Sequence, residues 1–368
     1  MLLTAAMLLT ACSRKPAPPK PYLAFVASRE TQAVMVADLA SFGVVATIPV
    51  ARPERVVVRP HARQVWALSA DGEISVIEIP NLKVTESGRP GGSARDLRFA
   101  PDGRQAYFLN PAKEEIVFVD ADSLKVAASV RVGAPLSSLA LSPDGKTLVA
   151  ASAAANRLYV VDARSRALLG SAEVGKEPGE TVILPDNSKA FVADAGEQKL
   201  SAVDIATRQL LSHIELGMKP GPLLLKPDGG EVFVLCPQAA TLAIVDAFHD
   251  NVSQNFPTGR EPSAAVIRKD STVLYIANAG DGSVTTFDVQ NRVVIASTQV
   301  GKEPRALALT PDERFLVAAD AATSSLAVLV AEPERLARMR SGLVTTIPVG
   351  AGPVDVVIPS WLRDESAE

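Results

Sequence analysis

The sequence predicts an all-β fold, a β-propeller built from four-stranded antiparallel blades. The 368 residues exceed the roughly 250–300 at which a single core stops growing, so the chain must split into domains or repeat. It repeats: a Pro-Asp anchor or a degenerate copy recurs about every 42 residues, a period typical of propeller blades. The anchors begin at Pro60, Pro101, Pro143, Pro185, Pro227, Lys269, Pro311 and Pro359.

Each repeat contains four short apolar segments separated by turn residues. In the unit around Pro143, strands are predicted at 138–141, 147–151, 158–162 and 168–174. Pro-Asp-Gly suits the turn between the first two strands, because Pro restricts φ and Gly accepts a positive φ. An aspartate ends most third strands, and we expect it to accept backbone hydrogen bonds from the following turn rather than to bind calcium.

The blade count follows from the two ends of the repeat array. The N-terminal segment supplies three strands without a first, at 22–28, 33–38 and 44–50, and the C-terminal segment supplies one strand, at 353–358. Together they complete one blade and close the ring, which removes free sheet edges. The prediction is eight blades. One insertion, residues 331–342, interrupts the last unit; Pro333 suits a helix start and Gly342 a stop.

The repeat resembles a known family. The segment 300–312 reads VGKEPRALALTPD and the segment 274–284 reads LYIANAGDGSV. Both strongly resemble the YVTN-family β-propeller repeat, and the resemblance covers residues 22–361. It implies the propeller fold and no particular activity. Members of that family more often have seven blades, so seven is the alternative count.

The first residues resemble a bacterial lipoprotein signal. Residues 1–11 are apolar, and Leu9-Thr10-Ala11-Cys12 is similar to the lipobox, which implies lipid attachment at Cys12. Residues 12–21 form a Pro-rich tether, and residues 362–368 a C-terminal tail. The resemblance implies a cell-envelope protein, with Ser13 favouring the outer membrane, facing the periplasm or the surface. No Lys or Arg precedes the apolar stretch, so we expect the true start upstream. The alternative is a secretory signal with an incidental cysteine.

Composition narrows the class of partner. The formal charge of −4 gives no electrostatic argument for nucleic acid, and no apolar run past residue 12 approaches a membrane span. Membrane contact is therefore expected only through the lipid, with the propeller a monomer. Two cysteines exclude a disulfide scaffold; Cys236 falls in an apolar strand and is expected to be a buried thiol.

The loops that enter the first strands carry the candidate ligand site. In a propeller these loops meet at the mouth of the central channel, where several copies read Gly-x-Glu-Pro. Slightly deeper, Asp96 and Asp355 accompany the candidates. The alternative is a set of exposed ion pairs worth about 0–1 kcal/mol each. The candidate residues are Arg52, Arg55, Lys176, Glu177, Glu180, Lys219, Arg260, Glu261, Lys302, Glu303 and Arg305.

No catalytic motif accompanies this site, so no catalytic residue, metal or cofactor is predicted. The three histidines are expected away from the mouth, with His61 and His249 in turns of the opposite face and His213 in a fourth strand. The favoured function is a non-catalytic binding or scaffold module for an envelope protein, a peptide or a glycan. Two alternatives stay open: a lactonase-like hydrolase using Glu180, Asp96 or Asp355, and a redox-cofactor-binding propeller.

Overall fold

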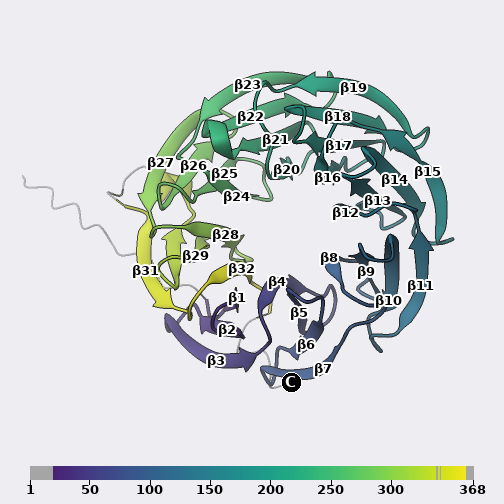
Figure 1. Ribbon diagram of the computed structural model, residues 1–368. Helices are drawn as coiled ribbons and strands as arrows, with labels where there is room; N and C mark the ends of the chain where they lie inside the picture. The colour runs from purple at the N-terminus through teal and green to yellow at the C-terminus, as the bar shows by residue number, and fades with distance from the viewer. Residues whose placement is uncertain (1–19, 337–338, 340, 362–368) are drawn as a thin grey trace, which may run out of the picture.

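The computed structural model describes residues 20–336, 339 and 341–361. The predicted signal, Cys12, most of the tether and the tail lie outside the described residues. Within the described part, 32 strands form eight four-stranded antiparallel sheets, which stand around one axis as the blades of a propeller (Figure 1). The prediction of eight blades is confirmed, and the alternative of seven is wrong.

The strands fall into four sets according to their place in a blade. The first, innermost strands are β4 (Pro53–Val58), β8 (Arg95–Phe99), β12 (Ser138–Leu141), β16 (Pro178–Ile183), β20 (Leu223–Leu225), β24 (Pro262–Ile267), β28 (Pro304–Leu309) and β32 (Pro353–Val357). The second strands are β1 (Leu23–Ser28), β5 (Gln64–Ser69), β9 (Gln105–Asn110), β13 (Thr147–Ser152), β17 (Lys189–Asp194), β21 (Glu231–Cys236), β25 (Val273–Asn278) and β29 (Phe315–Asp320). The third strands are β2 (Ala33–Asp38), β6 (Ile74–Glu78), β10 (Glu115–Asp120), β14 (Arg157–Asp162), β18 (Lys199–Asp204), β22 (Thr241–Asp246), β26 (Ser283–Asp288) and β30 (Ser325–Val330). The fourth, outermost strands are β3 (Gly43–Pro49), β7 (Lys83–Gly88), β11 (Val126–Arg131), β15 (Ala167–Glu173), β19 (Gln209–Glu215), β23 (Asn251–Pro257), β27 (Val293–Gln299) and β31 (Leu343–Pro348).

Observed strand ends differ from the predicted ones by about one residue. The fourth strand predicted over 168–174 ends at Glu173, because the Val174 N–H leaves the ladder and donates to the Asn156 carbonyl at 3.1 Å. The second strand predicted over 147–151 runs one residue further and ends on the polar residue Ser152.

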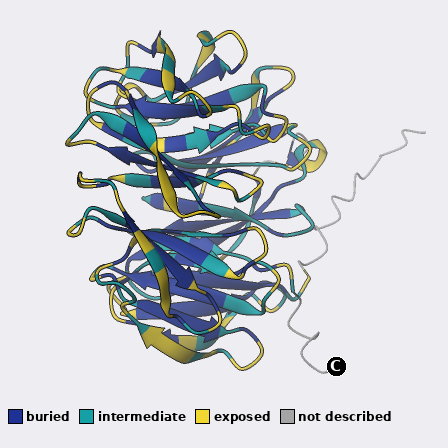
Figure 2. Ribbon diagram, turned by 90° about the vertical axis from the view of Figure 1, so that its right-hand side faces the viewer, coloured by how far each residue is buried: buried dark blue, intermediate teal, exposed yellow. Residues whose placement is uncertain are grey.

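The core lies between the blades. Second and third strands are buried on both faces because each sheet packs against a neighbour on either side, as the continuous burial of β1 and β2 illustrates. In the described part of the chain, each of the eight contacts between successive blades has its own hydrophobic cluster. Fourth strands instead alternate between half-buried and exposed residues. Seen edge-on, exposed residues gather in the loops and on the outer strands (Figure 2).

The ring closes through strands from the two ends of the chain. β32 pairs antiparallel with β1, with Val356 opposite Val26, and the sheet order is β3-β2-β1-β32. Past the ladder, the Arg29 N–H donates to the Gly352 carbonyl at 2.8 Å and the Ser28 hydroxyl to the Val349 carbonyl at 2.7 Å. The predicted composite blade is therefore present.

The predicted structural role of the third-strand aspartates is confirmed. Asp162 accepts the N–H groups of Arg164 and Ser165, and Asp120 accepts those of Asp122 and Ser123 in the same way. The insertion begins with a short helix at the predicted proline, α1 (Pro333–Leu336), and one 3-10 turn, η1 (Pro237–Ala239), follows β21. In the residues described, no helix is long and apolar enough to span a membrane.

Strand direction gives the ring two different faces. Antiparallel neighbours put the turns between first and second strands and between third and fourth strands at one end, which we call the turn face. The other end, the mouth face, carries the second-to-third loops and the connections from each fourth strand to the next first strand. The turn histidines His61 and His249 lie on the turn face, as predicted.

Candidate functional site

The connections that enter the first strands rest on a polar residue at the end of the second strand. Gly259 packs so closely on Asn278 that a Cβ there would lie 2.6 Å from its side chain, and Gly175 would meet Asp194 at 2.7 Å. The carbonyls of Arg260 and Glu261 then accept the N–H groups of Gly280 and Ala279. These contacts explain the recurring glycine and hold the connection rigidly at the mouth face.

The sequence analysis did not identify the residues at the ends of the second strands that support these connections, although the sequence contains a pattern that marks them. Each buried second strand ends on a small polar residue or a cysteine. The set is Ser28, Ser69, Asn110, Ser152, Asp194, Cys236, Asn278 and Asp320. The sequence prediction ended four of these strands one residue early, because a polar residue after an apolar run is typical of the start of a loop.

Asp194 and Asp320 occupy corresponding positions but have different partners. Both are fully buried. The Asp320 carboxylate accepts the N–H groups of Lys302, Glu303 and Thr323. Asp194 accepts the Ser201 hydroxyl at 2.6 Å, and its second oxygen has no partner among the described residues. Burial raises the pKa of Asp194 to about 6, against the opposing effect of the Ser201 hydrogen bond.

Replacing Asp194 by Asn should therefore stabilise the protein near neutral pH. The folded-state pKa lies above the unfolded value of 3.8, so this group's contribution is largest at low pH and is lost as pH rises through about 4 to 6. We expect D194N to raise the free energy of unfolding at pH 7.5 by about 1–3 kcal/mol and to flatten its dependence on pH between 4 and 6. Chemical denaturation over that range measures both.

Asp320→Asn is the matched control. An amide NH₂ in place of one oxygen would face two N–H donors, so this variant should lose about 1–3 kcal/mol. An equal effect of the two substitutions would contradict the assigned difference. Asn278, which already stands at the same position of another blade, shows that an amide fits: its NH₂ donates to Thr285 at 2.9 Å.

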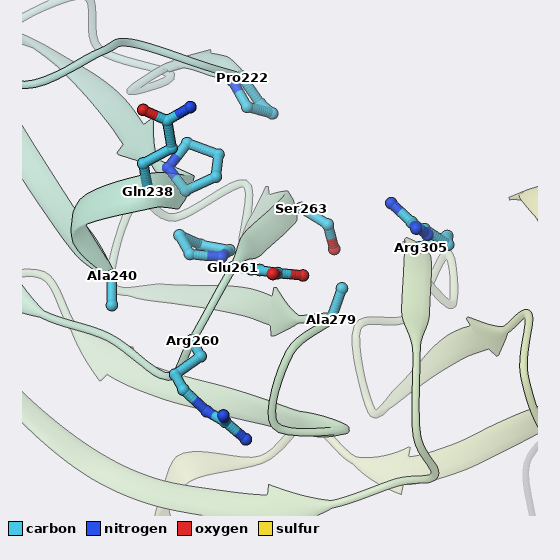
Figure 3. Close-up of a pocket in the computed structure, with 10 residues that line it drawn as sticks. Pro222, Gln238, Ala240, Arg260, Glu261, Ser263, Ala279 and Arg305 are labelled. Carbon is cyan, nitrogen blue, oxygen red and sulfur yellow. The ribbon is translucent and has the colours of Figure 1, made fainter.

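A cavity of about 540 Å³ opens on the mouth face between β20, β24 and β28. Its apolar walls come from Pro222, Pro237, Ala240, Pro262 and Ala279, and its polar groups from Gln238, Arg260, Glu261, Ser263 and Arg305. Figure 3 shows Glu261 and Ser263 pointing to the side on which Arg305 stands, whereas Arg260 points away at the outer edge. Arg305 pairs with Glu303, and Arg260 pairs with Asp281 at 2.5 Å.

A second charged group lies on the first strands β4, β8 and β16. Asp96 pairs with Arg55 at 2.7 Å and with Arg98 at 2.6 Å, and its other oxygen accepts the Leu139 N–H at 2.9 Å. Glu180 accepts the Leu223 N–H at 3.3 Å, and burial raises its pKa. These carboxylates join one blade to the next, which is a structural role.

Asp355 repeats this link at the closing blade. It accepts the Val56 N–H at 2.9 Å, and burial raises its pKa to about 6. A bulge near the start of β32 breaks the register between Pro353 and Asp355. Similar bulges occur in β4, β8, β16, β24 and β28, and bulges typically redirect a side chain.

The predicted mouth residues thus separate into groups instead of forming one uniform ring. Arg260, Glu261 and Arg305 line the cavity, with Glu303 held by Arg305. Arg55 and Glu180 belong to the links between blades. The remaining members are peripheral: Lys176 pairs with Glu197 at 3.3 Å, Lys219 approaches Glu177 at 4.0 Å, and the side chains of Arg52 and Lys302 have no ion pair within the described residues.

Side chains that could ligate a metal are dispersed in the part of the chain that the structure describes. Within the described part, no three His, Cys, Asp or Glu side chains gather closely enough to hold a metal ion. His213 lies on β19, with its Nδ1 3.1 Å from the Ser201 hydroxyl, and His249 pairs with Asp246 on the turn face. Burial raises the pKa of Cys236 to about 11, so it is the buried, unreactive thiol that was predicted. Among the described residues, no histidine lines the mouth-face cavity.

Comparison with known families gives one partial match. The model of a family described as lactonase, 7-bladed beta-propeller, matches residues 230–349, about a third of the chain. That stretch contains all the cavity residues except Pro222. A search of curated proteins finds no match.

Solved structures share the fold at low sequence identity. Dihydro-heme d1 dehydrogenase NirN in complex with DHE has a TM-score of 0.77 and 16% identity, covering 97% of this chain and 78% of that one. Hydrazine synthase from Kuenenia stuttgartiensis gives 0.57 and 19%, covering 73% and 96%. The Cps50 (Swd1) propeller domain of Myceliophteria thermophila gives 0.57 and 13%, covering 72% and 92%. At these identities, the similarity shows the fold alone.

Proposed function

We propose that this protein is a lipid-anchored cell-envelope propeller that binds a ligand at the mouth-face cavity without transforming it. The observation that carries the proposal is the cavity itself. Its volume of about 540 Å³ lies in the range of small-ligand sites, and it combines apolar walls with a few convergent polar groups. Rigid loops form it, so little ordering free energy would be lost on binding.

The lining favours a ligand with a carboxylate and an apolar body, such as the C-terminus of a peptide. A guanidinium has five N–H donors, so the pair between Arg305 and Glu303 leaves donors for a second anion. Three prolines and two alanines offer the apolar wall. An acidic glycan is the competing ligand class and would use the same arginine with less apolar contact.

Calorimetric titration with short apolar peptides, carrying either a free C-terminal carboxylate or an amide, tests this site. We expect the carboxylate peptides to bind and Arg305→Gln to weaken them at least tenfold, about 1.4 kcal/mol. Lys302→Gln is the matched control, because Lys302 lies on the same face, carries the same charge and does not line the cavity. Equal affinity for both variants, or for both peptide forms, would refute the proposed recognition.

The anchor has its own prediction. Cys12→Ala should move the protein from the membrane fraction to the soluble periplasm, because the Leu-Thr-Ala-Cys sequence supplies the only expected lipid attachment. Fractionation followed by a high-salt wash measures this. A variant that remains in the washed membranes would overturn the lipid anchor. Ser13→Ala, which leaves the cysteine in place, is the control and should stay in the membrane fraction.

A lactonase-like hydrolase is the second candidate, favoured by the family match over the stretch that forms the cavity. Glu261 is the carboxylate among the cavity-lining residues and the group positioned to act as a base. Lactone turnover that Glu261→Gln abolishes would support hydrolysis over simple binding. The redox alternative has a separate test, since a bound cofactor would give the purified protein a visible absorbance band.

A further inference from the structure

Exposed apolar side chains are distributed unequally between the two faces. Among the described residues, every exposed large hydrophobic side chain lies in a third-to-fourth connection or within the first three residues of a fourth strand. We call this set the apolar rim: Val44, Val126, Leu168, Leu169, Leu211, Phe248, Val293, Val294 and Met339. Because the fourth strands start at the turn face, the apolar rim encircles that face.

Four of these outer strands end on an exposed polar residue at the opposite face. β11 ends on Arg131, β15 on Glu173, β19 on Glu215 and β27 on Gln299, and all four residues are exposed. Among the described residues, the exposed large hydrophobic side chains therefore lie at the turn face, whereas the mouth-face ends of the outer strands carry exposed polar residues or, in β3, β23 and β31, an exposed proline. An exposed apolar zone bordered by polar residues is typical of an interaction surface.

The apolar rim is most continuous across β15, β19 and the connection before β23. These outer strands adjoin one another, so Leu168, Leu169, Leu211 and Phe248 follow one arc of the ring. Phe248 is 73% exposed, the largest value in the set. Arg164 and Arg166 flank this arc in the connection before β15, and neither has a carboxylate ion-pair partner among the described residues.

Both ends of the described chain lie at the turn face. β1, a second strand, starts there at Leu23, and β32, a first strand, finishes there at Val357. Tyr22 lies ten positions after Cys12, and a fully extended chain covers at most about 35 Å over that spacing. A lipid on Cys12 would therefore hold the turn face, with its apolar rim, close to the bilayer.

We infer that the turn face is a membrane-docking surface: the apolar rim enters the headgroup region of a phospholipid bilayer, and the cavity faces away from it. This inference rests on the proposed lipid anchor. Partial insertion of apolar side chains and attraction of Arg164 and Arg166 to lipid phosphates are the interactions that bind peripheral proteins. Neither is strong alone, and the lipid anchor would keep both contacts at the bilayer surface.

The two ends of β27 provide the test. Gln290 and Lys302 are exposed and flank this strand at the turn face and at the mouth face, respectively. Lipidated Q290C and K302C proteins, labelled with an environment-sensitive dye, would be reconstituted on vesicles of phosphatidylethanolamine and phosphatidylglycerol containing a nitroxide-labelled lipid. Cys236 is fully buried and should not react. We expect strong quenching of the label at residue 290 and little at residue 302.

Replacing Leu169, Phe248 and Val293 by Ser should reduce quenching at residue 290 several-fold while leaving the melting temperature nearly unchanged, because all three side chains are exposed. Equal quenching at both labels, or quenching unaffected by the serines, would overturn the docking surface. A separate measurement tests the lipid anchor. If the protein partitions equally onto vesicles with and without Cys12→Ala, the lipid anchor is wrong. If the label at residue 290 is still quenched more strongly than the label at residue 302 in that case, the docking surface stands and only the anchor is rejected.

Discussion

Deletion of residues 353–368 should unfold most of the protein. β32 supplies the innermost strand of the closing blade, and its residues pack on β1, β4, β28 and β29. The deletion removes the buried Val356 and the partly buried Val354, Val357 and Trp361. At about 1.5–3 kcal/mol for each fully buried side chain, the loss approaches the 5–15 kcal/mol by which whole domains are stable. Circular dichroism melting and gel filtration measure the result.

A shorter deletion gives the control. Removing residues 362–368 leaves every strand of the eight described sheets in place, so its melting temperature should match that of the intact protein. A synthetic peptide covering residues 349–361 should partly rescue the longer deletion, because it restores the hydrogen-bonded partner of β1. Unchanged melting and gel-filtration behaviour after the longer deletion would contradict the closure of the ring by β32.

Arg59→Ala should cause the largest loss from a single substitution. Arg59 follows β4 and is 7% exposed. Its guanidinium donates to the carbonyls of Gly103 at 2.8 Å and Ala121 at 2.9 Å, which belong to the next blade. It also pairs with Asp122 at 2.5 Å. Alanine would leave the two buried carbonyls without this donor, at about 1–3 kcal/mol each, whereas the Asp122 side chain is 76% exposed and would be solvated by water. We therefore expect a loss of about 2–5 kcal/mol.

For a chain of this length that loss corresponds to a fall in melting temperature of about 3–6 °C. Arg104→Ala is the matched control, because Arg104 is exposed in the neighbouring turn and its side chain makes no ion pair within the described part. Its effect should stay within about 0.5 kcal/mol. A fall of similar size in both variants would show that Arg59 does not link the blades. Arg268, which donates to the Glu313 carbonyl at 3.0 Å, repeats the arrangement in another blade.

The architecture could be predicted because it depends on local sequence patterns that repeat periodically. The Pro-Asp anchors, the apolar second and third strands and the aspartates before the turns recur at a fixed spacing, and each depends on neighbours close in the chain. Counting them yields eight blades and the closing role of the strand at Pro353. Even the burial of Cys236 follows from its position in a continuous apolar strand.

The candidate site was only partly predictable, since its members come from different blades. The sequence indicated that Arg260, Glu261 and Arg305 lie on the mouth face, but it equally indicated Lys176 and Lys302. Only the packed ring decided that the first three share one cavity, together with residues that no motif marks.

The same distinction applies to charge and to apolar exposure. By itself the sequence determined the fold, the favoured count of eight blades and the face on which each loop lies, because strand order and alternation set those. The tertiary structure decided which carboxylates accept hydrogen bonds from a neighbouring blade, as Asp96 and Glu180 do. It also decided that the exposed apolar residues gather at one face. The physical reason is that hydrogen bonds and burial between blades depend on side chains about 42 residues apart, a relation that local sequence patterns do not contain.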